Sequence, residues 1–439
     1  MNRRGLVFVV LMWVITALTS VAIYFAHSSR LAYLAAEATA SGFQADHAAV
    51  SAVEYVRLAI ETINTPGTIP DLEAEGYELE AVTVGDARFW LVGRDPAAIE
   101  APSAPAYRIT DEAGKLNINI ADPEMLEKLP GMTAELAAAI VDWRDEDDDV
   151  SANGAESEYY LTLATPYRAK NAAFESIDEL RLLAGVDPEV LEGEDRNRNG
   201  VLDPNENDGE TSWPPDNEDG TLQPGILAFV TVHSREPNTR TDGREKVNLR
   251  GPSARSDLEE LVRDTIGSGV FQQILANAGN DLGRPESVLE FYLESGLSET
   301  QFRQIEPSLT ASPGDYRTGA INVATAPREV LACLPGVTEE QAIELCTARE
   351  ALDAEQLKSV TWLTTVLDPD TCRLAGPHVT AQGWQVGIDV VAVGKSGNGF
   401  RRLFAVLDTE EGNVIYRRDM AREGWPMGDL DPTAREDEE

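Results

Sequence analysis

One stretch of the sequence has the residue types and spacing of a calcium-binding loop. Residues 195–206 carry oxygen-bearing side chains at positions one, three, five, nine and twelve, with Gly200 at position six, where the chain must turn sharply. In such a loop these oxygens and one backbone carbonyl surround the ion. The predicted ligands are Asp195, Asn197, Asn199, Val201 through its carbonyl, Asp203 and Glu206. Calcium is therefore the predicted cofactor, and a solvated polar loop without an ion is the alternative.

A second acidic loop lies earlier in the chain. Asp145, Asp147, Asp149 and Glu156 are spaced around Gly154 and offer carboxylates to another cation. Their spacing matches no standard calcium loop, and runs of acidic residues are commonly solvated. A second metal site and a plain charged surface both stay open for this loop.

The sequence offers little for catalysis. It contains no glycine-rich phosphate loop, no Gly-x-Ser-x-Gly and no Cys-x-x-Cys, and its four histidines are scattered without metal-binding spacing. Three cysteines (Cys333, Cys346 and Cys372) allow one disulfide at most, and buried thiols are the alternative. We expect a protein that is not an enzyme.

The charge balance argues against nucleic acid as a partner. The 439 residues contain 36 Lys and Arg against 76 Asp and Glu, which gives a net charge of −40. A nucleic-acid backbone is bound through basic residues that release counterions, and here the basic residues do not cluster. With 42% hydrophobic residues the chain is nevertheless globular in composition.

The N-terminus predicts a membrane-spanning helix. Residues 6–26 carry no charge and are long enough to cross a hydrocarbon layer of about 30 Å. Arg3 and Arg4 precede this run, which places residues 1–5 in the cytoplasm and the bulk of the chain outside. Apolar residues continue with helical spacing, and no proline occurs before Pro66, so one long helix is predicted, with an amphipathic second half.

Two sets of strand patterns flank the rest of the chain. They lie at residues 77–84, 88–92, 107–110, 384–393, 400–407 and 413–417. Together they predict one antiparallel sheet that lies on the N-terminal helix, with residues 113–378 inserted as a mostly helical domain. The predicted fold class is thus α+β, with a pilin-like body.

The inserted region contains an internal repeat. Residues 115–132 and 320–337 align on an asparagine, an alanine and a Leu-Pro-Gly turn, and residues 246–252 begin a copy without that turn. Each copy is followed by a second helical half, at 174–180, 285–291 and 357–363. The turns Leu129-Pro130-Gly131 and Leu334-Pro335-Gly336 look like helix-hairpin-helix turns, which bind DNA phosphates in many proteins. Glu135 and Glu340 follow them, so packing or protein contact is favoured over DNA here.

A short basic leader that ends in glycine and runs directly into an apolar helix resembles the type IV prepilin-like class. Cleavage by prepilin peptidase is then expected between Gly5 and Leu6. Most such subunits have glutamate as the fifth mature residue, whereas this chain has Val10. Because the glutamate pairs with the amine of a neighbouring subunit, its absence fits a subunit at the tip.

The order of these features resembles the minor pseudopilin K family of type II secretion systems (general secretion pathway protein K). The resemblance implies a non-catalytic inner-membrane protein whose bulk lies in the periplasm. It also implies assembly at the pseudopilus tip with the I- and J-type minor pseudopilins, contacts with the major pseudopilin and secreted substrates, and calcium in the inserted domain, including the loop around Glu156. The alternative function is a membrane-anchored DNA-uptake receptor.

The resulting domain organisation has seven parts. They are the leader 1–5, the spanning helix 6–26, its amphipathic continuation 27–64, the pilin-like strands 65–112, the insert 113–378, the closing strands 379–424 and an acidic tail 425–439. Within the insert we expect a first repeat at 115–191, the calcium loop at 192–220, a degenerate repeat at 246–305 and a third repeat at 319–376.

Overall fold

A computed structural model describes the chain over residues 3–94, 105–213, 215–279, 282–395, 397 and 399–428. The predicted leader residues Met1 and Asn2 and the predicted acidic tail from residue 429 onward lie outside the described residues.

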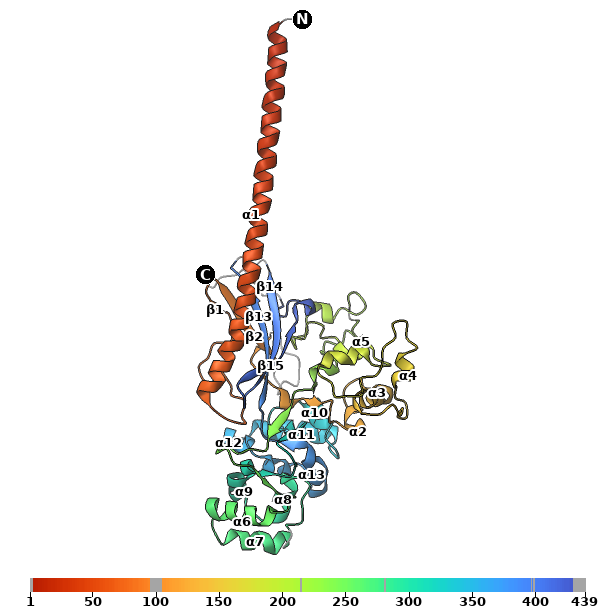
Figure 1. The fold of residues 1–439 in the computed structure, drawn as a ribbon, viewed down its shortest axis with the longest axis vertical. Coiled ribbons are helices and arrows are strands. Elements are labelled where there is room, and N and C mark those ends of the chain that lie inside the picture. Colours follow the sequence, from red (N-terminus) through yellow and green to blue (C-terminus); the bar gives the residue numbers. More distant parts are fainter. Residues whose placement is uncertain are drawn as a thin grey trace.

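A single helix, α1 (Arg3–Ile63), forms the N-terminal part of the protein, as the apolar periodicity predicts. Its first half projects away from every other element (Figure 1) and is exposed along its length. The segment Leu6–Ile63 is long and apolar enough to cross a membrane, with a mean hydropathy of 2.6 in its most apolar window. Small side chains on the second half, such as Ala48, Ala52 and Val56, are buried and let the helix approach the sheet closely.

One antiparallel sheet joins the two ends of the chain, and this confirms the predicted pairing of the early and late strands. The long strand β13 (Gln385–Val393) pairs with β2 (Ala87–Gly93) on one side and with β14 (Phe400–Asp408) on the other. The remaining strands are β1 (Val82–Val84), β3 (Ala106–Tyr107), β4 (Thr110–Asp111) and β15 (Asn413–Asp419), and the main order is β1-β2-β13-β14-β15. Alternate residues of β13, such as Ile388 and Val390, face α1.

The predicted strand at 77–84 begins only at Val82. Ala81 has a φ of 49°, in the left-handed region, which interrupts an extended backbone. The Tyr77 N–H donates to Leu72 O at 2.8 Å and thereby closes a turn instead of joining the sheet.

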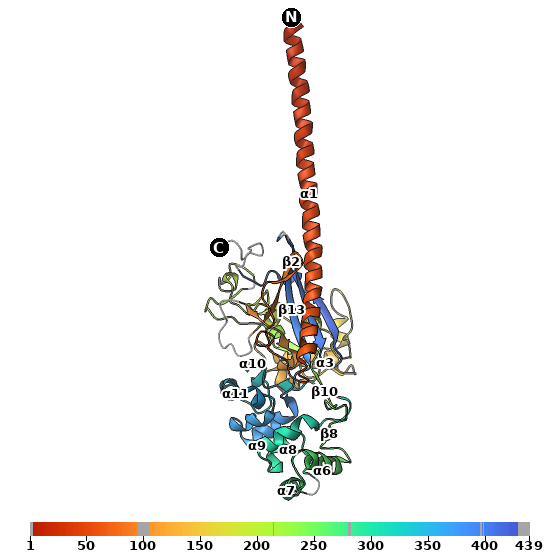
Figure 2. The same cartoon turned by 90° about the vertical axis from the view of Figure 1, so that its left-hand side faces the viewer.

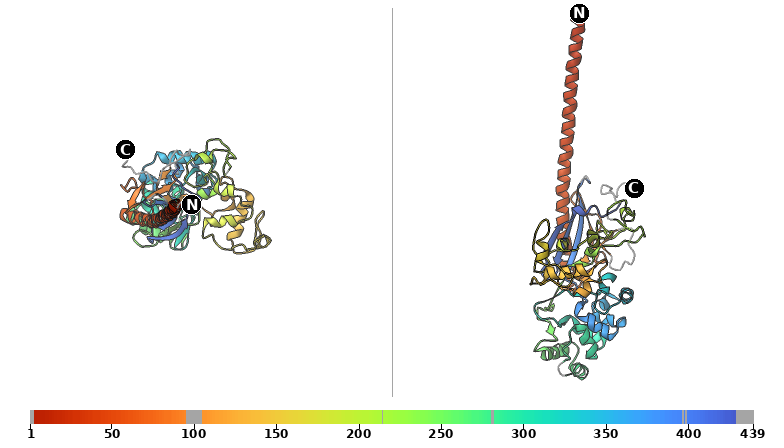
Figure 3. Two further views of the ribbon diagram at one scale, coloured as in Figure 1. Left: turned by 90° about the horizontal axis from the view of Figure 1, so that it is seen from above. Right: turned by 90° about the vertical axis from the view of Figure 1, so that its right-hand side faces the viewer.

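The inserted region forms two lobes (Figures 1, 2 and 3). We call residues 116–231 the side lobe, because it lies beside the sheet, and residues 235–380 the distal lobe, because it lies at the end away from the N-terminus. The side lobe contains β5 (Leu116–Asn117), α2 (Pro123–Leu126), α3 (Ala134–Arg144), α4 (Ser157–Tyr160), α5 (Pro188–Glu192) and β6 (Val230–Thr231).

The distal lobe is built from short helices and very short strands. Its helices are α6 (Ala254–Thr265), α7 (Val270–Ala278), α8 (Val288–Ser295), α9 (Glu299–Ile305), α10 (Arg328–Ala332), α11 (Glu339–Glu350), α12 (Ala354–Leu357) and α13 (Pro369–Ala375). Its strands are β7 (Arg235–Pro237), β8 (Val247–Asn248), β9 (Leu309–Thr310), β10 (Tyr316–Thr318), β11 (Ile321–Asn322) and β12 (Val379–Thr380). Residues between 247 and 309 have their own apolar core, whereas those between 321 and 379 share a core with the side lobe.

Three two-stranded parallel pairs recur through the insert. They are β5 with β6, β8 with β9, and β11 with β12. In each pair the first strand ends in asparagine, whose side-chain oxygen accepts the N–H two residues later at 2.9–3.1 Å. The second strand ends in threonine, whose hydroxyl accepts the N–H two residues later at 3.1–3.2 Å. The copy that starts at Lys246 and lacks Leu-Pro-Gly therefore has the same local geometry as the other two.

Several sequence-based expectations for the insert differ from the structure. The helical halves predicted at 174–180 and 357–363 are 3-10 helices, Ile177–Leu182 and Val360–Thr365, and each begins at a serine cap, Ser176 and Ser359. Between the helical segments, the 3-10 helix Ile226–Ala228 leads through Phe229 into β6. Of the two alternatives left open for the cysteines, the structure has buried thiols, since all three are free and buried.

Candidate metal centre

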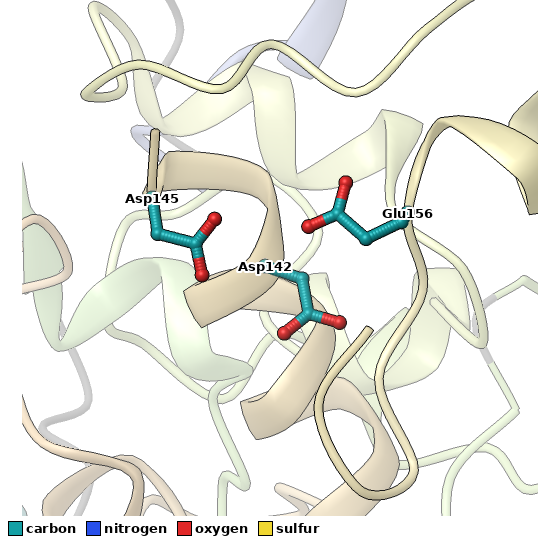
Figure 4. Close-up of side chains that lie close together, drawn as sticks. All are labelled: Asp142, Asp145 and Glu156. Carbon is teal, nitrogen blue, oxygen red and sulfur yellow. The ribbon is translucent and has the colours of Figure 1, made fainter. Parts of the chain in front are cut away.

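Three carboxylates from the side lobe converge on one point (Figure 4). Asp142 lies in the last turn of α3, Asp145 caps the C-terminal end of that helix, and Glu156 caps the N-terminal end of α4. Each contributes an oxygen, and these oxygens all lie within 4.8 Å of one another. We call these three residues the acidic cluster; no other group of three such ligands is this close among the described residues.

The acidic cluster is largely buried, and two of its carboxylate oxygens lack a hydrogen-bond partner among the described residues. Asp142 is 0% exposed and Glu156 4%. Asp145 Oδ1 and Glu156 Oε1 are buried and have no hydrogen-bond partner in the part of the chain that is described. Burial first, and then the neighbouring acidic groups, raise the pKa of Glu156 to about 7 and also raise the pKa of Asp145. Like charges at this spacing repel one another, and either a proton or a bound cation would relieve the repulsion.

The loop between the two helices encloses Asp142. The N–H of Ser151 donates to the Asp142 carboxylate at 3.2 Å. Gly154 lies so close to the same carboxylate that a Cβ at this position would collide with it. Position 154 therefore requires glycine for a steric reason, because only a residue without a side chain fits against Asp142.

The carboxylates that lie together in the structure are only in part those predicted as ligands from the acidic run. Asp145 and Glu156 belong to the cluster, but Asp147 and Asp149 are exposed, and Asp147 Oδ1 instead accepts the Asp149 N–H at 2.8 Å. Asp142 belongs to the cluster and was missed by sequence reasoning, because it precedes the acidic run and lies inside a helix. Its signal is the spacing: Asp142 and Asp145 are three residues apart, which places both on the same face of a helix end.

Hydrogen bonds among its own side chains and backbone hold the predicted calcium loop together. Asp195, Asn199, Asp203 and Glu206 are each at most 8% exposed. The Asn199 N–H is shared by Asp195 Oδ1 and Asn197 Oδ1, both at 3.0 Å. Asp203 Oδ2 accepts from the side-chain amides of Asn197 at 2.6 Å and Asn199 at 3.1 Å.

Glu206, at the final position of the loop, closes it back onto its own backbone. Its carboxylate accepts the Arg196 N–H at 3.1 Å and the Asp203 N–H at 3.2 Å. Burial raises the pKa of Glu206 to about 7. The loop thus differs from the acidic cluster, because backbone and amide donors satisfy its carboxylates.

Both places have a donor set that fits calcium. Carboxylate and amide oxygens are the ligands that this hard cation prefers. In the acidic cluster, three residues would hold the ion through oxygens that have no other partner. In the loop, the side-chain amides of Asn197 and Asn199 now point their nitrogens at Asp203 Oδ2. Rotating each amide group by 180° would point its oxygen there instead, where an ion could bind.

The calcium loop lies at the junction between the insert and the sheet. Arg94, directly after β2, forms an ion pair with Asp195. Arg402 of β14 donates to the carbonyls of Asn197 and Arg198. The Asn199 side-chain amide donates to Pro426 O at 2.9 Å, so the C-terminal segment contacts the loop as well.

The two Leu-Pro-Gly turns bury their leucines, Leu129 and Leu334, whereas Pro130, Gly131 and Gly336 are exposed. Lys128, from the first copy, donates through Nζ to Leu334 O at 2.8 Å and to Val337 O at 3.2 Å. The turn of the third copy therefore contacts the first copy through its carbonyls.

Comparison with known proteins finds similarity in the first part of the side lobe. A sequence model of the family described as type II secretion system (T2SS), protein K matches residues 116–193, which contain the acidic cluster. The likeness to the protein K family thus covers residues 116–193 of the chain. Type II secretion system protein K of Pectobacterium carotovorum subsp. carotovorum is 43% identical over 56 residues, which is 13% of this chain and 17% of that protein. The protein K of Klebsiella pneumoniae is 41% identical over 64 residues, which is 15% of this chain and 20% of that protein.

The aligned segments therefore span about a fifth of the length of these protein K relatives. Among solved structures, a chain of the GspK–GspI–GspJ complex from the enterotoxigenic Escherichia coli type 2 secretion system is similar over 89% of this chain and 98% of its own length, at 10% identity and a TM-score of 0.42. This degree of likeness lies below the level at which a shared fold is assigned, so the relationship rests on the match at residues 116–193.

Proposed function

We propose that this chain is a non-catalytic minor pseudopilin at the tip of a type II secretion pseudopilus, where it initiates and caps assembly for the export of folded proteins. The observation that carries the proposal is the combination of a segment similar to protein K with a long apolar helix packed on an antiparallel sheet. The segment is inserted between strands of that sheet, so one chain supplies both the filament-forming part and the part specific to the family.

The proposed orientation follows from the N-terminus. Residues 6–26 would lie in the inner membrane, with Arg3 and Arg4 in the cytoplasm and the rest of the chain in the periplasm. Prepilin peptidase would cut between Gly5 and Leu6. Co-expression with the peptidase followed by N-terminal sequencing should yield Leu6, whereas an intact Met1 would contradict pseudopilin processing.

The proposed partners are the I- and J-type minor pseudopilins, together with the major pseudopilin and secreted substrates. Val10, in place of a membrane-embedded glutamate, supports the tip position, since no preceding amine is required there. The test is co-purification of the full chain from detergent with tagged I and J partners. A stable ternary complex is expected, and separate elution of the three proteins would contradict the proposed tip role.

Calcium is the proposed cofactor. Its support is the oxygen donor set of the acidic cluster and of the loop at residues 195–206. Adding calcium to the full chain should raise its melting temperature, and Glu206→Gln should remove the part of that shift that arises in the loop. An unchanged melting temperature with calcium would contradict this part of the proposal.

A further inference from the structure

The predicted calcium loop already holds a cation that comes from a different part of the fold. Arg94 follows β2 directly, and its guanidinium forms an ion pair with Asp195, the first predicted ligand. The Asp195 side chain is 1% exposed and the Arg94 side chain 29%, so water reaches this pair only from the Arg94 side. A partly buried pair is screened by salt far less than a surface pair.

A second contact fixes Arg94 at this position. The aliphatic stem of Arg94 covers Gly200, at the sharp turn of the loop, so closely that a Cβ on Gly200 would meet Arg94 Cγ at 2.9 Å. The guanidinium of Arg94 therefore lies at the first predicted ligand, and its stem lies over the turn at the middle of the loop.

Orientation of Asp195 does not depend on Arg94. The Asn199 N–H donates to Asp195 Oδ1 and the Gly200 N–H donates to Asp195 Oδ2, both at 3.0 Å. These two backbone donors already fix the carboxylate. The effect of Arg94 on an ion in the loop is thus mainly electrostatic: it neutralises a ligand and repels a second cation.

We propose that Arg94 is a built-in competitor of calcium that weakens binding in the loop at residues 195–206. This inference rests on the proposed calcium function. Since Arg94 belongs to the sheet side of the junction and the loop belongs to the insert, the competition also links ion binding to the contact between them. Calcium in the loop loosens the pair of Arg94 with Asp195, and a tight pair disfavours calcium.

The test compares Arg94→Gln with Arg196→Gln. Arg196 lies in the same loop and carries the same charge, but its side chain is exposed and donates to Trp213 O at 3.2 Å. Both variants are made in the full chain with Asp142→Asn, which removes the acidic cluster as a competing site. Calcium affinity is measured by calorimetric titration in detergent, and circular dichroism checks that each variant is folded.

Arg94→Gln should tighten calcium binding by about tenfold or more, because the charge paired with the first predicted ligand is lost. Arg196→Gln should change the affinity by less than about twofold, because its exposed charge is screened. Arg94→Lys, which keeps the charge, should bind calcium nearly as the parent does, and it serves as the test if Arg94→Gln does not fold.

Three outcomes overturn the inference. If calcium binds the parent but Arg94→Gln binds equally or more weakly, Arg94 does not compete, while the proposed calcium function stands. If both glutamine variants tighten binding equally, the tightening comes from the loss of any positive charge near the loop and not from the loss of the Arg94–Asp195 ion pair. If the Asp142→Asn parent binds no calcium, calcium in the loop fails together with the inference.

Discussion

The two acidic places in the insert bury their carboxylates in opposite ways. In the loop at residues 195–206, backbone N–H groups, two asparagine amides and Arg94 satisfy the carboxylates. In the acidic cluster, two carboxylate oxygens have no partner among the described residues, and three negative side chains face one another. The place with the regular calcium-loop spacing thus has its carboxylates hydrogen-bonded and one of them ion-paired, whereas the place without a recognisable spacing leaves two oxygens without a partner.

The spacing of potential ligands along the sequence and the uncompensated negative charge at a site are therefore separate properties. A pattern reports which oxygens a loop is able to present. The uncompensated charge depends on which hydrogen-bond donors and cations the fold places beside those oxygens, and some of these groups, such as Arg94, come from elsewhere in the chain. On this basis the acidic cluster should bind calcium more tightly than the loop.

The largest expected effect comes from removing the central ligand of the acidic cluster. Asp142→Asn should weaken calcium binding there by about 100-fold, since ligand charge sets calcium affinity. Asp147→Asn is the matched control, because Asp147 belongs to the same acidic segment but is exposed and outside the cluster. Equilibrium dialysis with radioactive calcium measures both. Equal losses in the two variants would show that the cluster is only a diffuse acidic surface.

A smaller effect is expected from filling the space beside Asp142. Gly154→Ala would drive a methyl group into the Asp142 carboxylate and should cost about 2 kcal/mol of unfolding free energy. Gly269→Ala is the control, because a Cβ at Gly269 meets nothing within 4 Å. Urea unfolding followed by circular dichroism gives both values. A cost that is equally large for Gly269→Ala would remove the steric explanation.

The smallest effect concerns a carboxylate that is neither in the cluster nor in the loop. Glu306 is half-buried and accepts from the Ser359 hydroxyl and from the Val360 N–H. Burial raises its pKa to about 7. A raised folded-state pKa means that the folded protein binds the proton more tightly, so this contribution to stability is complete below about pH 4.5 and is lost as the pH rises through 7.

Glu306→Gln should therefore remove about 1 kcal/mol of pH-dependent stability between pH 4.5 and 7, after allowance for its partial exposure. Glutamine retains an acceptor for Val360 and a polar contact for Ser359. The exposed Glu340→Gln serves as the control, and urea unfolding at several pH values in chelator provides the measurement. An unchanged pH dependence in Glu306→Gln would contradict the assigned burial effect.

Much of the fold follows from local sequence patterns. The uninterrupted apolar spacing before Pro66 predicts α1. The alternation of apolar residues predicts β2, β13 and β14, with bounds that differ from the observed ones by no more than one residue. The shared asparagines predict the relation between the repeated segments, whose strand pairs have one geometry. These features depend on neighbours in the chain, which is why sequence reasoning reaches them.

The candidate sites depend on contacts between distant segments. Asp142 lies on a helix and meets Glu156 only when the intervening loop folds back. Arg94 reaches Asp195 only because the insert docks beside β2. Neither contact has a periodic signal. The short 3-10 helices have the same cause, since tertiary packing and capping by Ser176 and Ser359, more than helix propensity, set their length.

The most direct test of the two-site account is the number of calcium ions bound to each full-length chain. Native mass spectrometry of the detergent-solubilised protein at saturating calcium should count two ions in the wild type, one in Asp142→Asn and none in the Asp142→Asn/Glu206→Gln double variant. A wild type that binds no calcium, or a count that is the same in all three proteins, would contradict the assignment of both places as metal centres.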